Sequence, residues 1–191
     1  VAQVRGLILA MPHHGNWEML SAAVAQNLPI TGLYRPPRQA FLEPIMTAGR
    51  STSRVRMVPT DRSGVKALHR ALADGEVIAM LPDQVPKKAG AAGVVAPFFG
   101  HDAMTMTLIG RLAARQQSPV LLVWAQRQPD GRYRAEFFEA DPAIADRDST
   151  IAASALNRAL ERCIRSSPNQ YQWAYRRYGA LGPGYPNPYR R

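Results

Sequence analysis

Residues 6–18 of the chain are Gly6-Leu7-Ile8-Leu9-Ala10-Met11-Pro12-His13-His14-Gly15-Asn16-Trp17-Glu18. The apolar run over residues 6–11 predicts a buried strand, and the stretch over residues 17–27 predicts a helix with one apolar face. Gly15 allows the backbone to turn sharply between the two, and Asn16 is a residue type that caps helix starts. This segment therefore predicts a strand–turn–helix unit.

The rest of the chain repeats this alternation. Strands are expected at residues 30–34, 56–59, 76–81, 119–126 and 133–139, and helices at residues 40–49, 64–73, 105–115 and 150–165. Residues 82–103 are rich in proline and glycine and are expected to form a long functional loop. The pattern predicts an α/β fold: one domain over residues 1–191, with a mainly parallel central sheet flanked by helices and an antiparallel hairpin near the end.

The composition indicates which partners to expect. The chain has 24 Lys and Arg against 14 Asp and Glu, which gives a net charge of +10 and a pI near 10.5. Such a balance favours polyanionic partners, although a basic surface kept for solubility has the same composition. Nucleic acid is not expected, because the chain has no helix-turn-helix signature, zinc-ligand spacing or RNA-binding aromatic motif. Cys163 is the single cysteine, so an intrachain disulfide is excluded.

The end of the first strand carries the first candidate for chemistry. His13 follows the apolar run, and Glu18 comes five residues later in the first turn of the predicted helix. A carboxylate there can orient the imidazole and leave its second nitrogen free to accept a proton. His14 could face the acid as well. The alternative is a glutamate that stabilises the helix dipole beside two loop histidines without chemistry.

Polar side chains also follow two other predicted strands. Arg35 follows the second strand, and Asp83 and Gln84 follow the fourth. Ligands bind beyond the carboxyl ends of the strands in open parallel sheets, so these side chains are expected to converge with His13 on one edge. The arginines between positions 35 and 56, Arg50 among them, suit phosphate or an oxyanion, and a solvated basic face is the alternative. No set of His, Cys and Asp residues has metal-ligand spacing.

Several segments together resemble one protein family, the bacterial lipid A biosynthesis acyltransferases, which include the lauroyl- and myristoyltransferases of late lipid A assembly. The matching segments are His13-His14-Gly15-Asn16-Trp17-Glu18, Tyr34-Arg35-Pro36, Leu81-Pro82-Asp83-Gln84, residues 93–100 with Pro97-Phe98-Phe99, and Gln170-Tyr171-Gln172-Trp173 followed by Arg176-Arg177. The family pattern of His, four residues, then Asp or Glu selects His13 with Glu18. His14 is a departure, because the family usually has an apolar residue there.

The resemblance implies a glycerolipid acyltransferase-like fold and acyl transfer without a cofactor or metal. Its implied donor is an acyl carrier protein thioester, and its implied acceptor is a hydroxyl of a phosphorylated glycolipid, the lipid A precursor. It assigns catalysis to His13 with Glu18, and we expect Asn16, Arg35, Arg50, Asp83 and Gln84 to bind substrate.

The resemblance also implies a place in the cell. Family members work at the cytoplasmic face of the Gram-negative inner membrane and carry an N-terminal membrane segment, which we expect to be missing here. Two alternatives stay open: transfer to another membrane glycolipid or aminolipid, and a non-catalytic basic lipid-binding module of the same fold.

Overall fold

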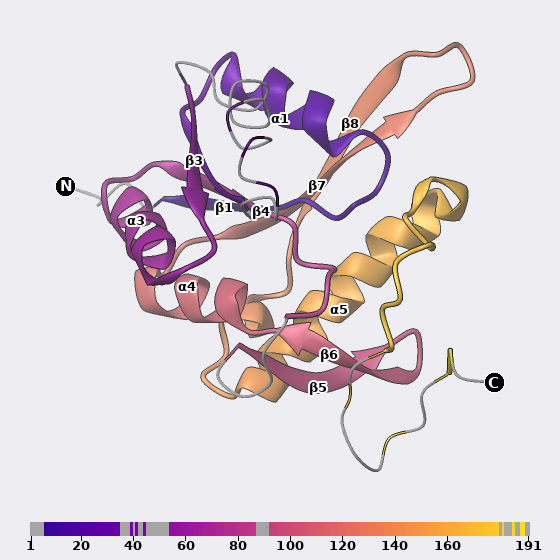
Figure 1. Cartoon of the computed structure of the whole chain (residues 1–191). Coiled ribbons are helices and arrows are strands. Elements are labelled where there is room, and N and C mark those ends of the chain that lie inside the picture. The colour runs from indigo at the N-terminus through magenta and orange to yellow at the C-terminus, as the bar shows by residue number, and fades with distance from the viewer. Residues whose placement is uncertain are drawn as a thin grey trace.

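The computed structural model describes residues 6–34, 54–86 and 92–179, with isolated positions 39, 41, 44, 181, 185, 188 and 189. A six-stranded sheet forms the centre (Figure 1), in the order β3 (Val55–Pro59), β2 (Ile30–Tyr34), β4 (Val77–Met80), β1 (Leu7–Ala10), β7 (Val120–Arg127) and β8 (Tyr133–Glu139). All neighbouring pairs are parallel except β7 with β8. The predicted mainly parallel sheet is therefore confirmed.

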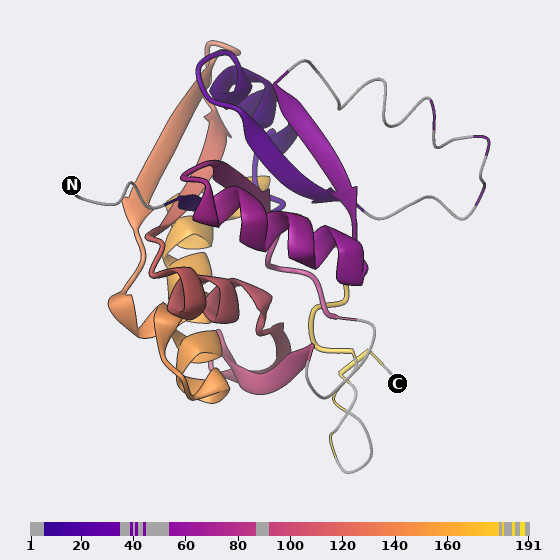
Figure 2. The same ribbon diagram turned by 90° about the vertical axis from the view of Figure 1, so that its left-hand side faces the viewer.

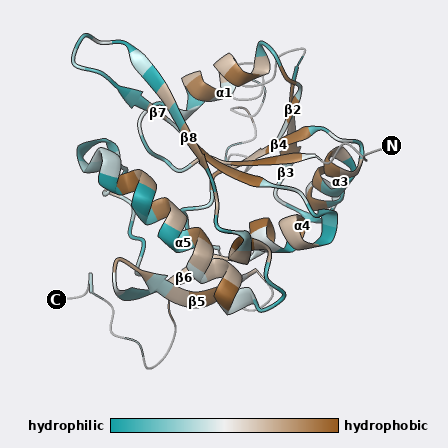
Figure 3. Cartoon of the chain, turned by 180° about the vertical axis from the view of Figure 1, so that it is seen from behind, coloured by the Kyte–Doolittle hydropathy of each residue, from teal (hydrophilic) through white to brown (hydrophobic). Residues whose placement is uncertain are grey.

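Helices cover both faces of this sheet. Helix α1 (Trp17–Ala25) lies on one face, and α3 (Arg62–Ala73), α4 (Leu108–Gln116) and α5 (Ser149–Ser166) lie on the other (Figures 1 and 2). Residues of β1 and Met11, which follows it, alternate between the two layers. Ile8 and Ala10 pack toward α3, α4 and α5, whereas Leu9 and Met11 pack toward α1. Strands that are buried on both faces are apolar along their length, and the inner strands of the sheet are accordingly largely brown in Figure 3.

Part of the predicted long loop is a hairpin instead. Strands β5 (Gly93–Phe98) and β6 (His101–Met106) pair in antiparallel fashion and pack against α5 (Figure 1). The turn residues Phe99 and Gly100 have φ of 49° and 77°, which is the backbone shape that two-residue hairpin turns require. The loop prediction over residues 82–103 is wrong for this portion, and α4 starts at Leu108 because the preceding residues belong to β6.

The turn between β1 and α1 has the predicted chemistry. Gly15 has φ of 62°, and a Cβ atom there would lie 1.8 Å from the carbonyl oxygen of Ala125, so a side chain is excluded. The Asn16 side chain accepts a hydrogen bond of 3.0 Å from the backbone N–H of Met19 and caps α1. Both predictions are confirmed, and the tight turn leaves His13 at the end of its strand.

Two further predictions meet the limits of the described residues. The weak helix predicted at residues 40–49 falls almost wholly outside them. Among the helices that the structure describes, none combines the length and the apolar character needed to cross a lipid bilayer.

Candidate active site

Sheet register brings His13 and Asp83 together. Strands β1 and β4 are parallel neighbours, and their last paired residues are Ala10 and Met80. His13 lies three positions beyond Ala10, and Asp83 lies three positions beyond Met80. Two loops that follow adjacent, in-register parallel strands extend an equal distance beyond the sheet edge after the same number of residues. The two side chains therefore meet although 70 residues separate them in sequence.

Both carboxylate oxygens of Asp83 are used on His13. Oδ1 lies 2.8 Å from the imidazole Nδ1, and Oδ2 accepts a 2.9 Å hydrogen bond from the backbone N–H of His13. The Asp83 side chain is 2% exposed and the His13 side chain 18% exposed. A carboxylate so buried needs such partners, and two fixed contacts leave the imidazole little freedom to rotate.

These contacts define the proton positions on the His13 ring. An ionised carboxylate is an acceptor, so Nδ1 carries the proton and donates it to Asp83. The other ring nitrogen, Nε2, then has a free lone pair, and it lies 3.2 Å from Nε2 of the Gln84 side chain, whose amide can donate to it. The Trp17 ring meets the imidazole edge-on, with 6.1 Å between centroids. The arrangement presents Nε2 as a base that one amide contacts.

The adjacent histidine lies in a different environment. His14 is fully buried, and its Nε2 lies 3.0 Å from the carbonyl oxygen of Ser167, to which an N–H can donate. Its ring stands edge-on to Trp124 and tilted to Tyr171. Burial lowers the pKa of His14, so the neutral form is favoured. These contacts give His14 a packing role between the sheet and the segment after α5.

The remaining predicted site residues lie at the same edge of the sheet or outside the described residues. Glu18 is exposed in the first turn of α1, and Asn16 caps that helix. Gln84 contacts the imidazole as described above. Arg35 and Arg50 lie outside the described residues. The structure thus brings Asp83 and Gln84 onto the two nitrogens of His13, a pairing that the sequence did not specify.

A further part of the site comes from the segment that follows α5, residues 167–178, here called the C-terminal strap. Its Gln172 N–H donates to the carbonyl oxygen of His13 at 3.1 Å, and Gly15 N–H donates to the carbonyl oxygen of Gln170 at 3.0 Å. The hydroxyl of Tyr175 accepts a 2.8 Å hydrogen bond from the N–H of Val85, two residues beyond Asp83. The strap therefore holds the loops that carry both His13 and Asp83.

Two buried strap residues add charge and polarity behind the carboxylate. Tyr171 is buried, and this burial, followed by the nearby charge of Asp83, raises the pKa of its hydroxyl. Arg177 is also buried; its guanidinium donates to the carbonyl oxygen of Met104 and to Thr105 Oγ1. The sequence motif containing Tyr171 and Arg177 marked this segment as part of the family resemblance but gave neither residue a role. Both residues belong to the strap, which contacts the loops that follow β1 and β4.

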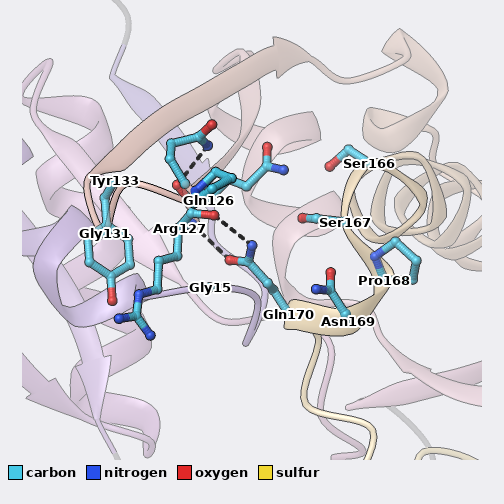
Figure 4. A pocket seen from close by; sticks show the side chains of 12 residues that line it. Gly15, Gln126, Arg127, Gly131, Tyr133, Ser166, Ser167, Pro168, Asn169 and Gln170 are labelled. Atoms are coloured by element: carbon cyan, nitrogen blue, oxygen red, sulfur yellow. Dashed lines mark hydrogen bonds between the residues drawn. The ribbon is translucent and has the colours of Figure 1, made fainter.

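A polar pocket of about 860 Å³ lies between the end of β7 and the start of the strap (Figure 4). Its walls are the end of β7 with the following turn, the end of α5 with the start of the strap, and Gly15. The Gln170 amide ties two of these walls together, because it accepts from the N–H of Arg127 at 2.8 Å and donates to its carbonyl oxygen at 2.9 Å. His13, Asp83 and Gln84 are not among the lining residues.

The chain is also similar to known proteins. A family model described as bacterial lipid A biosynthesis acyltransferase matches residues 1–179. The chain is similar to a lipid A biosynthesis lauroyltransferase of Escherichia coli K12, with 30% identity over 98% of the chain and 61% of the relative. It is also similar to a lipid A biosynthesis palmitoleoyltransferase of the same organism, with 27% identity over 92% of the chain and 56% of the relative.

A third relative comes from another organism. A lipid A biosynthesis acyltransferase of Haemophilus influenzae is 28% identical over 92% of the chain and 56% of the relative. The chain thus spans about three-fifths of the length of these curated relatives. Because the family model covers nearly the whole chain, from residue 1 to residue 179, the chain belongs to the bacterial lipid A biosynthesis acyltransferase family.

Proposed function

We propose that the protein transfers a fatty acyl chain from an acyl carrier protein thioester to a hydroxyl of a lipid A precursor, with His13 as the general base. The observation that carries this proposal is the fixed imidazole of His13. Its Nδ1 lies 2.8 Å from the buried carboxylate of Asp83, and its Nε2 lies 3.2 Å from the Gln84 amide, which a substrate hydroxyl can replace. The family membership supplies the reaction class and the acceptor class.

The proposed reaction begins with proton removal. An acceptor hydroxyl takes the position of the Gln84 amide at His13 Nε2 and gives up its proton as its oxygen attacks the thioester carbonyl carbon. Asp83 stabilises the imidazolium that forms, as a carboxylate bonded to Nδ1 does. We also assign Glu18, five residues after His13 and in the first turn of α1, to the same stabilisation as a second carboxylate.

The second half of the reaction breaks the thioester. The tetrahedral intermediate carries an oxyanion, and it collapses with cleavage of the carbon–sulfur bond. The imidazolium returns its proton to the departing thiolate, so that the base is regenerated and an ester and a thiol are released. The thioester is already activated, so a covalent acyl-enzyme is not required.

Charged partners fit the composition of the chain. The net charge of +10 favours an acidic carrier protein, a phosphorylated glycolipid and an anionic membrane surface. We assign Arg35 and Arg50 to phosphate or carrier recognition, and Asn16 and Gln84 to the edge of the substrate site. The proposed location is the cytoplasmic face of the inner membrane.

The test uses the full-length protein with panels of acyl donors and acceptors, and mass spectrometry of the lipid products. An acylated lipid A precursor formed from the carrier-protein thioester supports the proposal. If product forms only with a different glycolipid or aminolipid, the reaction is the same but the acceptor is that other lipid. If no donor and acceptor combination gives product and the lipids are merely bound, the protein is a lipid-binding module instead.

A further inference from the structure

The turn formed by Asp83, Gln84 and Val85 carries both groups that contact the His13 ring. Asp83 Oδ1 is 2.8 Å from Nδ1, and Gln84 Nε2 is 3.2 Å from Nε2. A displacement of this one turn would alter both contacts at once. Whatever holds the turn therefore determines how well the imidazole is oriented.

Tyr175 contacts this turn directly. Its hydroxyl oxygen accepts the N–H of Val85 at 2.8 Å, across 90 residues of sequence. The tyrosine ring is half-buried, and a phenol on a short, stiff side chain is a well-defined acceptor position. The hydrogen bond fixes the backbone immediately after the two residues that contact His13.

The strap that carries Tyr175 is anchored on both sides of it. On one side, Gln172 N–H donates to the carbonyl oxygen of His13 at 3.1 Å. On the other side, the buried Arg177 donates to Thr105 Oγ1 at 2.9 Å and to Asn157 Oδ1 at 3.3 Å, which ties the strap to β6 and α5. Tyr175 is thus held between one anchor on the histidine loop and another in the protein interior.

We propose that Tyr175 is a positioning residue, which keeps Asp83 and Gln84 on the two nitrogens of His13 through its hydrogen bond to Val85. This inference rests on the proposed function of His13 as a base, and it adds Tyr175 to the residues that hold that site in place. Tyr175 does not need to touch the substrate for this role.

The experiment compares two tyrosine-to-phenylalanine variants of the full-length protein. Tyr175→Phe deletes the hydroxyl that holds the turn. Tyr178→Phe is the matched control, because its hydroxyl also makes a hydrogen bond to a backbone group. Tyr178 donates to the carbonyl oxygen of Phe98 at 3.2 Å, on the hairpin rather than on the site loops, whereas Tyr175 accepts from Val85. Both variants should melt within a few degrees of each other, since each loses one hydrogen bond.

We expect Tyr175→Phe to lower kcat about tenfold, the effect of one lost orienting hydrogen bond, with KM for both substrates unchanged. The acidic limb of its pH profile for kcat/KM should move to lower pH, because a loosened Asp83 stabilises the imidazolium less. Tyr178→Phe should match the wild type in kcat and in pH profile.

A spectroscopic readout makes the test independent of turnover. The proton on His13 Nδ1, hydrogen-bonded to Asp83, should give a low-field NMR signal that is weakened or lost in Tyr175→Phe and kept in Tyr178→Phe. Equal kcat, equal profiles and equal signals in the two variants would overturn the positioning role. A wild-type protein without acyl transfer would instead contradict the proposed function, while the comparison of signals would still decide whether Tyr175 holds the turn.

Discussion

At the scale of single residues, the adjacent histidines differ because the chain turns between them. His13 lies against a carboxylate at the sheet edge, whereas His14 lies in the interior and bonds to Ser167. We expect His13→Gln to lower the acyl-transfer rate by at least about 10²-fold with little change in melting temperature, as for loss of a general base. His14→Gln should lower the melting temperature more than the rate. A reversed result, measured by product formation and thermal unfolding, would assign the base to His14.

Asp83 and Glu18, the two carboxylates of the proposed mechanism, provide a second comparison. Asp83→Asn and Glu18→Gln are each expected to reduce kcat by about 10²-fold, because each removes a negative charge that favours the imidazolium. Only Asp83→Asn should also remove the low-field Nδ1 proton signal, since Oδ1 of Asp83 lies 2.8 Å from that nitrogen. Full activity in Glu18→Gln would leave Asp83 as the sole supporting acid.

The buried His14 gives a pH dependence of stability with a definite sign. Burial lowers its pKa from 6.5, so between pH 7 and pH 5 the unfolded state takes up a proton that the folded state does not. The free energy of unfolding should therefore fall as the pH falls through this range. Denaturant unfolding of His14→Phe should show a flatter dependence between the same pH values; an unchanged slope would contradict the assignment.

At the scale of secondary-structure elements, the β5–β6 hairpin shows where the sequence was insufficient. Hairpin turns with two positive φ angles are usually recognised by Asn-Gly or Asp-Gly, whereas this turn is Phe99-Gly100. Tertiary contacts offset the unfavourable positive φ of Phe99. Its N–H donates to Glu161 Oε1 at 2.7 Å, and the Arg165 guanidinium lies 4.9 Å from its ring centroid. These partners are on α5, more than 60 residues away, so local patterns could not reveal them.

The contact between this turn and α5 can be tested by paired substitutions. Glu161→Ala leaves the N–H of Phe99 without its acceptor and should lower the free energy of unfolding by about 1–2 kcal/mol. Glu161→Gln keeps an acceptor oxygen and should lose less than half of that amount. Chemical denaturation measures both, and equal losses would show that charge rather than the hydrogen bond matters at this position.

At the scale of the whole molecule, the alternation of apolar runs and amphipathic stretches was enough to predict the α/β class, and the strand ends were enough to place His13 and Asp83 on one edge. Their direct pairing was not predictable, because it depends on β1 and β4 being neighbours in the sheet, and strand order is not written in the local pattern. The role of the strap was not predictable for a related reason. Its hydrogen bonds reach back to loops that come 90 or more residues earlier in the chain.

The net charge also acts at this scale. With +10 overall, the protein should bind anionic phospholipid vesicles and not zwitterionic ones, since each basic residue near an anionic surface contributes about 1 kcal/mol. Raising the salt from about 0.05 M to about 0.5 M should release it, because screening shortens the range of the attraction. Vesicle co-sedimentation measures this, and salt-insensitive binding would point to apolar insertion instead.

The equal spacing of His13 and Asp83 from the paired residues Ala10 and Met80 has a consequence for how this site can vary. The two side chains meet because each lies the same number of residues beyond the last paired residue of its strand. Inserting or deleting one residue in either loop would break that count, whereas many point substitutions within it would not. Among natural homologues we therefore expect length changes to accumulate elsewhere, while the interval between each strand end and its reactive side chain stays constant.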